Sequence, residues 1–126
     1  MADIDKLTKD VLKFRNDREW AQFHNPKDVS ISLALEAAEL LEHFQWKTPE
    51  EIAVHIKTGK EEISDELADV LYWVLLLSRD LDIDISKALG RKLRKNAKKY
   101  PLEKSRGKIT STISFKRRFK IHRRQK

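Results

Sequence analysis

The chain has 126 residues and no cysteine, so disulfides and thiolate metal sites are excluded. The length suits a single domain with a small core, and the longest apolar run, residues 70–77, is far shorter than the roughly 20 residues that a transmembrane helix needs. The formal net charge of +7 is unevenly spread: residues 1–90 hold 11 Lys and Arg against 19 Asp and Glu, whereas residues 91–126 hold 16 against one. This asymmetry indicates an anionic partner, or a contact within the molecule, for the basic end.

The spacing of apolar residues predicts five helices. The first ends before Pro26, because proline disfavours helical backbone in the residue that precedes it. The second begins after Asp28 or Ser30, either of which can cap a helix. In chain order, the predicted helices cover residues 4–23, 29–45, 49–57, 60–81 and 85–99.

The third helix has the clearest start signal. Thr48 is the expected N-cap, Pro49 the first helical residue, and Glu51 completes a capping box three residues after the cap. Gly59 ends this helix and Pro101 stops the fifth. Because every predicted element is helical, the sequence predicts an all-α fold, a bundle of four to five helices.

The C-terminal segment differs from the rest of the chain. Helical periodicity fades after Gly107, and the sequence ITSTISFKRRFKIHRRQK offers little apolar surface to offset the entropy of ordering it. We therefore predict a domain over residues 1–108 and a disordered basic tail over residues 109–126. Such a tail would attract nucleic acid weakly and in a salt-sensitive way.

Two carboxylate pairs stand at the edges of two apolar helices. Glu36 and Glu39 are three residues apart on the second helix, and Glu66 and Asp69 are three apart on the fourth, so each pair shares a helix face. If the apolar rows of these helices pack together, the four carboxylates meet at the rim of the seam, where they repel unless cations neutralise them. Oxygen ligands in this number favour Mg²⁺ or Mn²⁺ over zinc.

The carboxylates have two other interpretations. The first is that they are surface acids on solvated faces, which is the usual role of a single ExxE pair in a helix-rich chain. The second is a di-iron centre, which needs Glu-x-x-His motifs. The nearest match is Glu39 with His43, but these are four residues apart and the fourth helix has no histidine, so the sequence disfavours this centre.

An ExxE motif, a 26-residue spacer and an ExxD motif resemble the signature of the MazG-like superfamily of all-α nucleoside triphosphate pyrophosphohydrolases, which also includes dimeric dUTPases. Further segments resemble the branch that contains dCTP pyrophosphatase, and the likeness extends over roughly residues 5–108. These segments are FRNDREWAQFHNPKDVSISLALEAAELLEHFQWK, DELADVLYW and NAKKYP.

The resemblance implies a reaction in which a nucleoside triphosphate and water give a monophosphate and pyrophosphate with Mg²⁺, or with Mn²⁺ in its place. It implies that Glu36, Glu39, Glu66 and Asp69 are the catalytic residues and the metal ligands. It further implies that substrate is bound by Trp20, His24, Trp46, Lys47, Trp73, Asn96 and Tyr100. Trp73 departs from the tyrosine that this branch often has at that position.

The sequence as a whole therefore predicts a cytoplasmic pyrophosphohydrolase with no membrane association. The resemblance points to a pyrimidine deoxynucleotide such as dCTP or a modified dCTP as substrate, and to a role in nucleotide-pool sanitation. A single subunit offers few helices for a closed core, so a homodimer or homotetramer is expected.

Two rival functions are compatible with parts of the sequence. One is a helical nucleic-acid-binding module that acts through residues 91–126 and needs neither Mg²⁺ nor the carboxylates. The other is a degenerate, inactive family member, which the presence of all four carboxylates disfavours.

Overall fold

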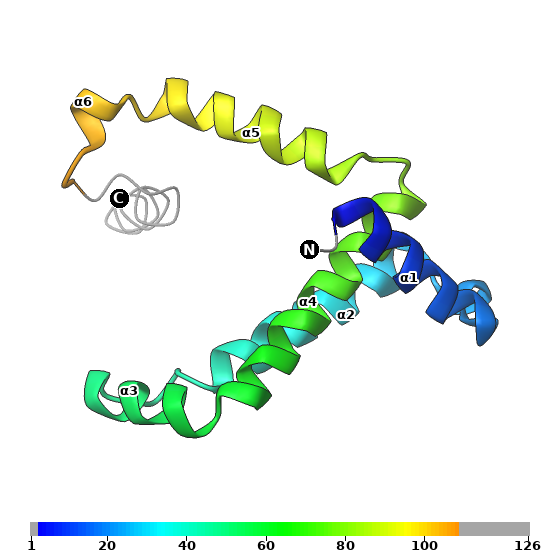
Figure 1. Cartoon of the computed structure of the whole chain (residues 1–126), viewed down its shortest axis with the longest axis horizontal. Coiled ribbons are helices and arrows are strands. Elements are labelled where there is room, and N and C mark those ends of the chain that lie inside the picture. The colour runs from blue at the N-terminus through cyan, green and yellow to red at the C-terminus, as the bar shows by residue number, and fades with distance from the viewer. Residues whose placement is uncertain (1–2, 109–126) are drawn as a thin grey trace, which may run out of the picture. The chain divides into compact units, whose positions relative to one another are not determined.

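The structure, a computed structural model, describes residues 3–108, and every regular element in this part of the chain is helical (Figure 1). The all-α prediction is therefore confirmed, whereas the predicted tail, residues 109–126, lies outside the described residues. None of the described helices combines the length and the apolar character needed to cross a membrane. The elements are α1 (Ile4–Asp17), η1 (Trp20–Phe23), α2 (Pro26–Glu42), α3 (Pro49–Thr58), α4 (Lys60–Asp80), α5 (Ile85–Lys99) and α6 (Leu102–Ser105).

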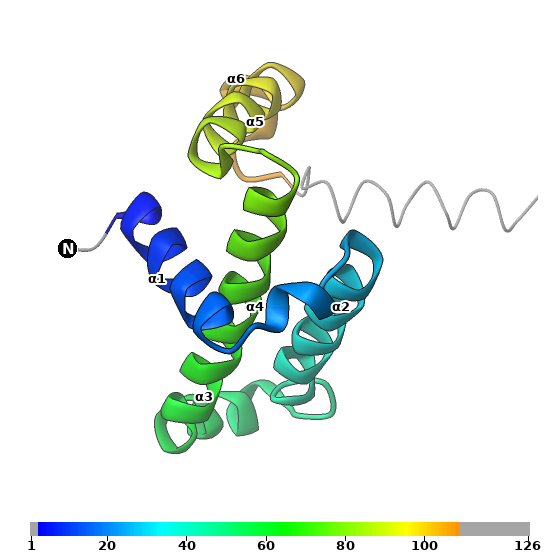
Figure 2. The same cartoon turned by 90° about the vertical axis from the view of Figure 1, so that its right-hand side faces the viewer.

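The chain divides into two units, the second of which begins at Ser86 and is described as far as residue 108. In the first unit, α2 and α4 run antiparallel along each other and form its most extensive helix pair (Figures 1 and 2). Helix α1 packs on α4, and α3 lies at the end where α2 finishes and α4 begins. The described part of the second unit holds α5 and α6.

The core of the first unit is small. Val29 of α2 and the adjacent Leu75 and Leu76 of α4 are its fully buried apolar side chains among the described residues. The apolar rows expected to fill the seam are only partly covered: Leu41 and Leu67 are each 53% exposed. The α2–α4 seam thus leaves much of both apolar faces open in the single chain.

The first helix is shorter than predicted. It ends at Asp17, and Glu19 takes a left-handed backbone conformation with φ 53°, which turns the chain out of the helix. Residues Trp20–Phe23 then form a separate 3₁₀ turn. The prediction of one helix over residues 4–23 was therefore wrong, because a left-handed residue usually signals itself by glycine or asparagine and here it is a glutamate.

The second helix starts earlier and ends earlier than predicted. The Asn25 side chain accepts a hydrogen bond from the Asp28 backbone N–H at 2.9 Å, and Pro26 is the first helical residue. The expectation of a start after Asp28 or Ser30 was wrong, since proline at this position needs no hydrogen-bond donor and its fixed φ suits the first turn. Helix α2 ends at Glu42 rather than residue 45.

The later boundaries follow the sequence signals closely. The Thr48 hydroxyl accepts from the Glu51 backbone N–H at 3.2 Å, and the Glu51 carboxylate accepts from the Thr48 backbone N–H at 3.1 Å, so the predicted capping box is confirmed. Gly59 ends α3 as predicted, and α4 and α5 lie within a residue of their predicted bounds. The short α6 after Pro101 was not predicted.

An ion pair between the buried Arg15 and the partly exposed Asp80 fastens α1 to the end of α4. The Arg15 guanidinium donates two hydrogen bonds to the Asp80 carboxylate, at 2.8 and 2.9 Å. Hydrogen bonding to Asp80 raises the pKa of Arg15, against the effect of burial. This pair sets the position of α1 along α4, and with it the aromatic side chains that α1 carries.

Candidate active site

Three of the predicted carboxylates converge between α2 and α4. One oxygen from each of Glu36, Glu39 and Glu66 lies within 4.8 Å of the others, and we call these three residues the carboxylate cluster. Asp69 follows Glu66 by one helical turn and lies outside this group of three, although its charge acts on Glu36. The i, i+3 spacing puts each pair of carboxylates on one face of its helix, and the packing of α2 on α4 brings the two faces together.

The electrostatics of the carboxylate cluster are unfavourable without a cation. The Oε2 atoms of Glu36 and Glu66 are buried and have no hydrogen-bond partner among the described residues. The pKa of Glu36 is raised to about 7, and burial is the largest cause. The closeness of the Glu66 and Glu39 carboxyls, which favours a shared proton, raises this pKa further, as do the charges of Glu39 and Asp69. Buried carboxylate oxygens without donors are expected to bind protons or cations.

The cluster fits a divalent cation with oxygen ligands. It supplies carboxylates alone, since the histidines of the described residues lie outside the group, and such a donor set suits Mg²⁺ or Mn²⁺. Glu36, Glu39 and Glu66 would hold the ion directly, and Asp69 is placed to complete the set from the next turn of α4.

An apolar hollow of about 470 Å³ lies on one side of the carboxylate cluster. Glu36 and Asp69 stand at its edge, and the predicted substrate-binding residues Trp20 and Trp73 line it. We call it the aromatic hollow. Its remaining lining residues are Leu7, Asp10, Val11, Phe14 and Tyr72.

Edge-to-face ring contacts build the wall of the aromatic hollow. Phe14 meets Trp20 at 5.9 Å and Tyr72 at 6.0 Å between ring centroids, and Tyr72 meets Trp73 at 5.1 Å. Phe14 and Tyr72 were not among the predicted site residues. The helical spacing predicts Phe14 as a core residue of the first helix. The separate turn at Trp20, which the sequence did not predict, is what places the Phe14 ring at the hollow.

His24 joins the same group of rings. Its ring meets Trp73 edge-on at 5.4 Å, and its buried Nδ1 has no hydrogen-bond partner among the described residues. The 3₁₀ turn Trp20–Phe23 holds His24 next to the start of α2. A buried nitrogen without a partner is a group that a further hydrogen bond would satisfy.

A second hollow, of about 460 Å³, shares Glu39 and Glu66 with the cluster. The predicted residue Lys47 lines it, together with His43 and His55. We call it the polar hollow. Glu42 and Glu62 complete its lining.

His24 lines neither hollow itself but contacts Trp73, whereas three further predicted substrate residues are not brought to either hollow within the first unit. Trp46 lies in the turn after α2 and is 86% exposed. Asn96 and Tyr100 belong to the second unit, where the Tyr100 backbone N–H donates to the Asn96 carbonyl at 2.7 Å. The single chain therefore gathers Trp20, His24, Trp73 and Lys47 around the carboxylates.

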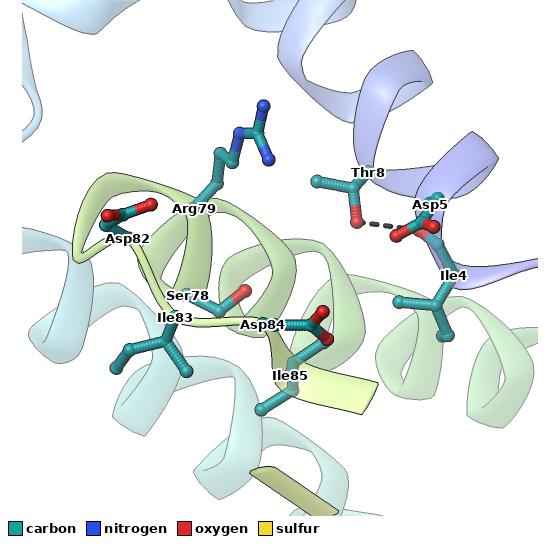
Figure 3. Close-up of a pocket in the computed structure, with 9 residues that line it drawn as sticks. All are labelled: Ile4, Asp5, Thr8, Ser78, Arg79, Asp82, Ile83, Asp84 and Ile85. Carbon is teal, nitrogen blue, oxygen red and sulfur yellow. Dashed lines mark hydrogen bonds between the residues drawn. The ribbon is translucent and has the colours of Figure 1, made fainter. Parts of the chain in front are cut away.

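A third hollow, of about 170 Å³, lies between the start of α1 and the turn after α4 (Figure 3). It contains none of the predicted site residues. Its two hydroxyl groups are engaged locally: Thr8 donates to the Ile4 carbonyl at 2.7 Å and Ser78 to the Leu75 carbonyl at 2.9 Å. We assign it no role in the site.

The sequence matches the model of the MazG-like family over residues 31–111. The chain belongs to the MazG-like family. It is 35% identical over 109 residues to dCTP pyrophosphatase 1 from Rattus norvegicus and 33% identical over 108 residues to that from Homo sapiens, which covers 85% and 84% of this chain. The chain spans 62% of the length of each of these curated relatives.

The solved structure of a pyrophosphatase from Archaeoglobus fulgidus has the same fold. It is 36% identical to this chain, with a TM-score of 0.74 over 80% of this chain and 94% of that one. The MazG-like fold predicted from the two carboxylate motifs is therefore confirmed.

Proposed function

We propose that this MazG-like chain is a nucleotide pyrophosphohydrolase, which converts a nucleoside triphosphate to a monophosphate and pyrophosphate. The observation that carries the proposal is the position of the carboxylate cluster between two hollows of unlike chemistry. An aromatic hollow suits a nucleobase, and a polar hollow in which one lysine lies among glutamates suits phosphates that carry a divalent cation. The names of the relatives, dCTP pyrophosphatase 1 and a pyrophosphatase, agree with this reaction.

The chemistry is a hydrolysis at the α-phosphorus. A water oxygen forms a new bond to that phosphorus, the bond from it to the bridging oxygen breaks, and the pyrophosphate leaves with that oxygen and its electron pair. The buried oxygens of Glu36 and Glu66 would hold a divalent cation, which would supply charge neutralisation on the triphosphate and a lowered pKa of water. The Glu39 carboxylate would accept the proton of the attacking water.

The aromatic hollow is proposed to hold the base and sugar. Trp20 and Trp73 line this hollow and would offer ring faces on which a base stacks, a contact worth about 1–3 kcal/mol. His24 supplies a polar atom next to Trp73 with which the edge of a base can be recognised. We propose a pyrimidine deoxynucleotide, dCTP or a modified relative, as the substrate, in keeping with the relatives' name.

The active form is proposed to be a homodimer or a dimer of dimers. Large apolar side chains are exposed on both helices of the seam, including Leu35 at 60% and Leu67 at 53%. Trp46, at 86% exposure, adds a large aromatic surface that a contact with another chain would remove from water. A second copy that covers these faces would also bring new side chains, Trp46 among them, to the sites.

A nucleotide panel tests the function directly. Purified protein is incubated with each of the common ribo- and deoxynucleoside triphosphates in ¹⁸O-water, with Mg²⁺, with Mn²⁺ or with EDTA. We expect monophosphate and pyrophosphate, the label in the monophosphate, and no turnover in EDTA. Label found in released orthophosphate, or unchanged turnover in EDTA, would overturn the proposal.

A further inference from the structure

Two histidines are hydrogen-bonded to each other beside the carboxylate cluster. His43, at the end of α2, has its Nδ1 2.9 Å from Nε2 of His55 on α3. The rings are stacked, with centroids 5.1 Å apart and planes inclined by 27°, and both are half-buried. We call these residues the histidine pair. They join the end of α2 to α3 across the turn that carries Lys47.

The hydrogen bond decides which nitrogens remain for a ligand. One ring donates and the other accepts, so the nitrogens left over are Nε2 of His43 and Nδ1 of His55. The second of these lies against Gly59, where an added Cβ would be 3.2 Å from Nδ1 and 2.9 Å from Cε1. His43 also lines the polar hollow, so we take its Nε2, on the side away from Gly59, as the nitrogen that meets a ligand.

The state of His55 sets the chemistry of that nitrogen. When His55 donates from Nε2, His43 accepts at Nδ1 and carries its own proton on Nε2. When a neutral His43 instead donates from Nδ1, its Nε2 carries no proton and can only accept. A phosphate oxygen therefore selects the first state, in which His43 offers an N–H donor and His55 acts as the positioning residue that orients it.

The polar hollow is where this donor would act. Its lining joins the histidine pair and Lys47 to Glu39 and Glu66 of the carboxylate cluster. The aromatic hollow borders the cluster through Glu36 and Asp69 instead. A triphosphate whose base occupies the aromatic hollow and whose α-phosphate meets the cluster would extend its β- and γ-phosphates into the polar hollow.

We propose that the polar hollow is the subsite for the pyrophosphate leaving group, with His43 as a phosphate-binding residue that His55 positions and Lys47 as a second cation. This deepens the proposed function and rests on it. The hollow also contains Glu42 and Glu62, which would repel a bare anion. The ligand that suits so mixed a lining is pyrophosphate as its magnesium complex, the form in which the reaction would release it.

Replacements of His43 separate phosphate binding from helix positioning. In His43→Asn the amide reaches the place of Nδ1, so the link to His55 is kept and the outer donor is lost. In His43→Gln the amide reaches toward the place of Nε2, so the outer donor is kept and the link is lost. Binding of magnesium pyrophosphate is measured by calorimetry without nucleotide, alongside the melting temperature and the inhibition of turnover by pyrophosphate and by nucleoside monophosphate.

We expect His43→Asn to weaken magnesium pyrophosphate binding by about tenfold or more, the usual effect of losing a hydrogen bond to a charged group, with monophosphate inhibition and melting temperature unchanged. His55→Gln, which keeps a polar group at Nε2, should retain more pyrophosphate affinity than His55→Leu. Lys57→Ala is the matched control, because it removes an exposed cation from the same helix without touching the hollow.

Unchanged pyrophosphate binding in His43→Asn, with a lowered melting temperature in His43→Gln, would show that the histidine pair is only a link between α2 and α3 and would overturn the proposal. Equal losses for pyrophosphate and monophosphate would also overturn it, because the residue would then act on the whole site. Since calorimetry needs no turnover, the subsite can be confirmed even if every nucleotide in the panel proves not to be a substrate.

Discussion

The protonation of Glu36 links the carboxylate cluster to the stability of the fold. Its pKa lies near 7 in the folded chain, against an ordinary value of 4.5, first because it is buried and then because other carboxyls surround it. Between these two pH values the folded state holds a proton that the unfolded state has released. The stability that this proton provides is complete below about pH 4.5 and is lost as pH rises through 7.

The first prediction follows from this linkage. In EDTA, the melting temperature should fall as pH rises from about 4.5 to 7, by roughly 5–10 °C if 1–2 kcal/mol of stability is lost. Glu36→Gln, which stays neutral, should flatten the dependence, and saturating Mg²⁺ should reverse it, because the ion binds the ionised form. Thermal unfolding across a pH series measures all three, and the same slope in Glu36→Gln would contradict the assignment.

The second prediction concerns the other carboxylates. Glu39→Gln and Asp69→Asn should each reduce turnover by at least about a hundredfold, because the loss of one carboxylate weakens both the hold on the metal and its orientation. Helix content should not change. Glu61→Gln is the control, since Glu61 is exposed in the first turn of α4 and lines none of the described hollows. Near-normal turnover in either site variant would remove that residue from the site.

At the scale of elements, prediction succeeded where a local signal fixes the backbone. Thr48, Pro49 and Glu51 determine the start of α3 by hydrogen bonds within four residues, so the sequence alone suffices. It failed at Glu19 because the left-handed residue there is a glutamate and not the glycine or asparagine that usually marks such a turn. The error carried over to the site: with Trp20 assigned to the first helix, the group of rings that Phe14 and Tyr72 make with it was not foreseen.

The site itself was predictable only in its helical periodicity. Residues three apart on one helix must share a face, so the spacing of Glu36 and Glu39 is enough to place them side by side. The histidine pair had no such signal, because His43 and His55 lie on different helices and meet only through the turn between them. Contacts between elements depend on how that turn is folded, and the sequence does not specify it.

The third prediction tests how α1 is held. Asp80→Ala leaves the Arg15 guanidinium without its partner and should destabilise the protein by about 1–3 kcal/mol, because Asp80 is partly exposed. The aromatic hollow should loosen as α1 shifts, which raises KM for nucleotide. Asp17→Ala is the control: it breaks an exposed pair with Lys13 and should change stability by less than about 1 kcal/mol. Equal small effects in chemical denaturation would show that the pair of Arg15 and Asp80 does not hold α1.

At the scale of the whole molecule, the exposed apolar surface is the feature that the single chain leaves unexplained. Only three apolar side chains are fully buried among the described residues, while Trp46, Leu35 and Leu67 are all more than half exposed. Burying such side chains contributes about 25 cal/mol per Å² of apolar area, so leaving them in water forgoes much of the stability available to a chain of this size. Association of copies is the direct way to recover it.

The fourth prediction tests that association. Leu35→Lys places a charge on the exposed apolar face of α2, where Ile31, one turn earlier, is also exposed. It should shift the mass in solution from an oligomer toward the monomer, measured by analytical ultracentrifugation over a range of concentrations, because an unpaired charge in an interface is costly to desolvate. Turnover per chain should fall with the oligomer fraction if neighbouring copies complete the site.

Ser30→Lys is the control, because it adds the same charge to the same helix at a polar position and should leave the mass unchanged. A parent protein that is monomeric and fully active at every concentration would show instead that one chain holds a complete site and that these apolar faces serve some other contact.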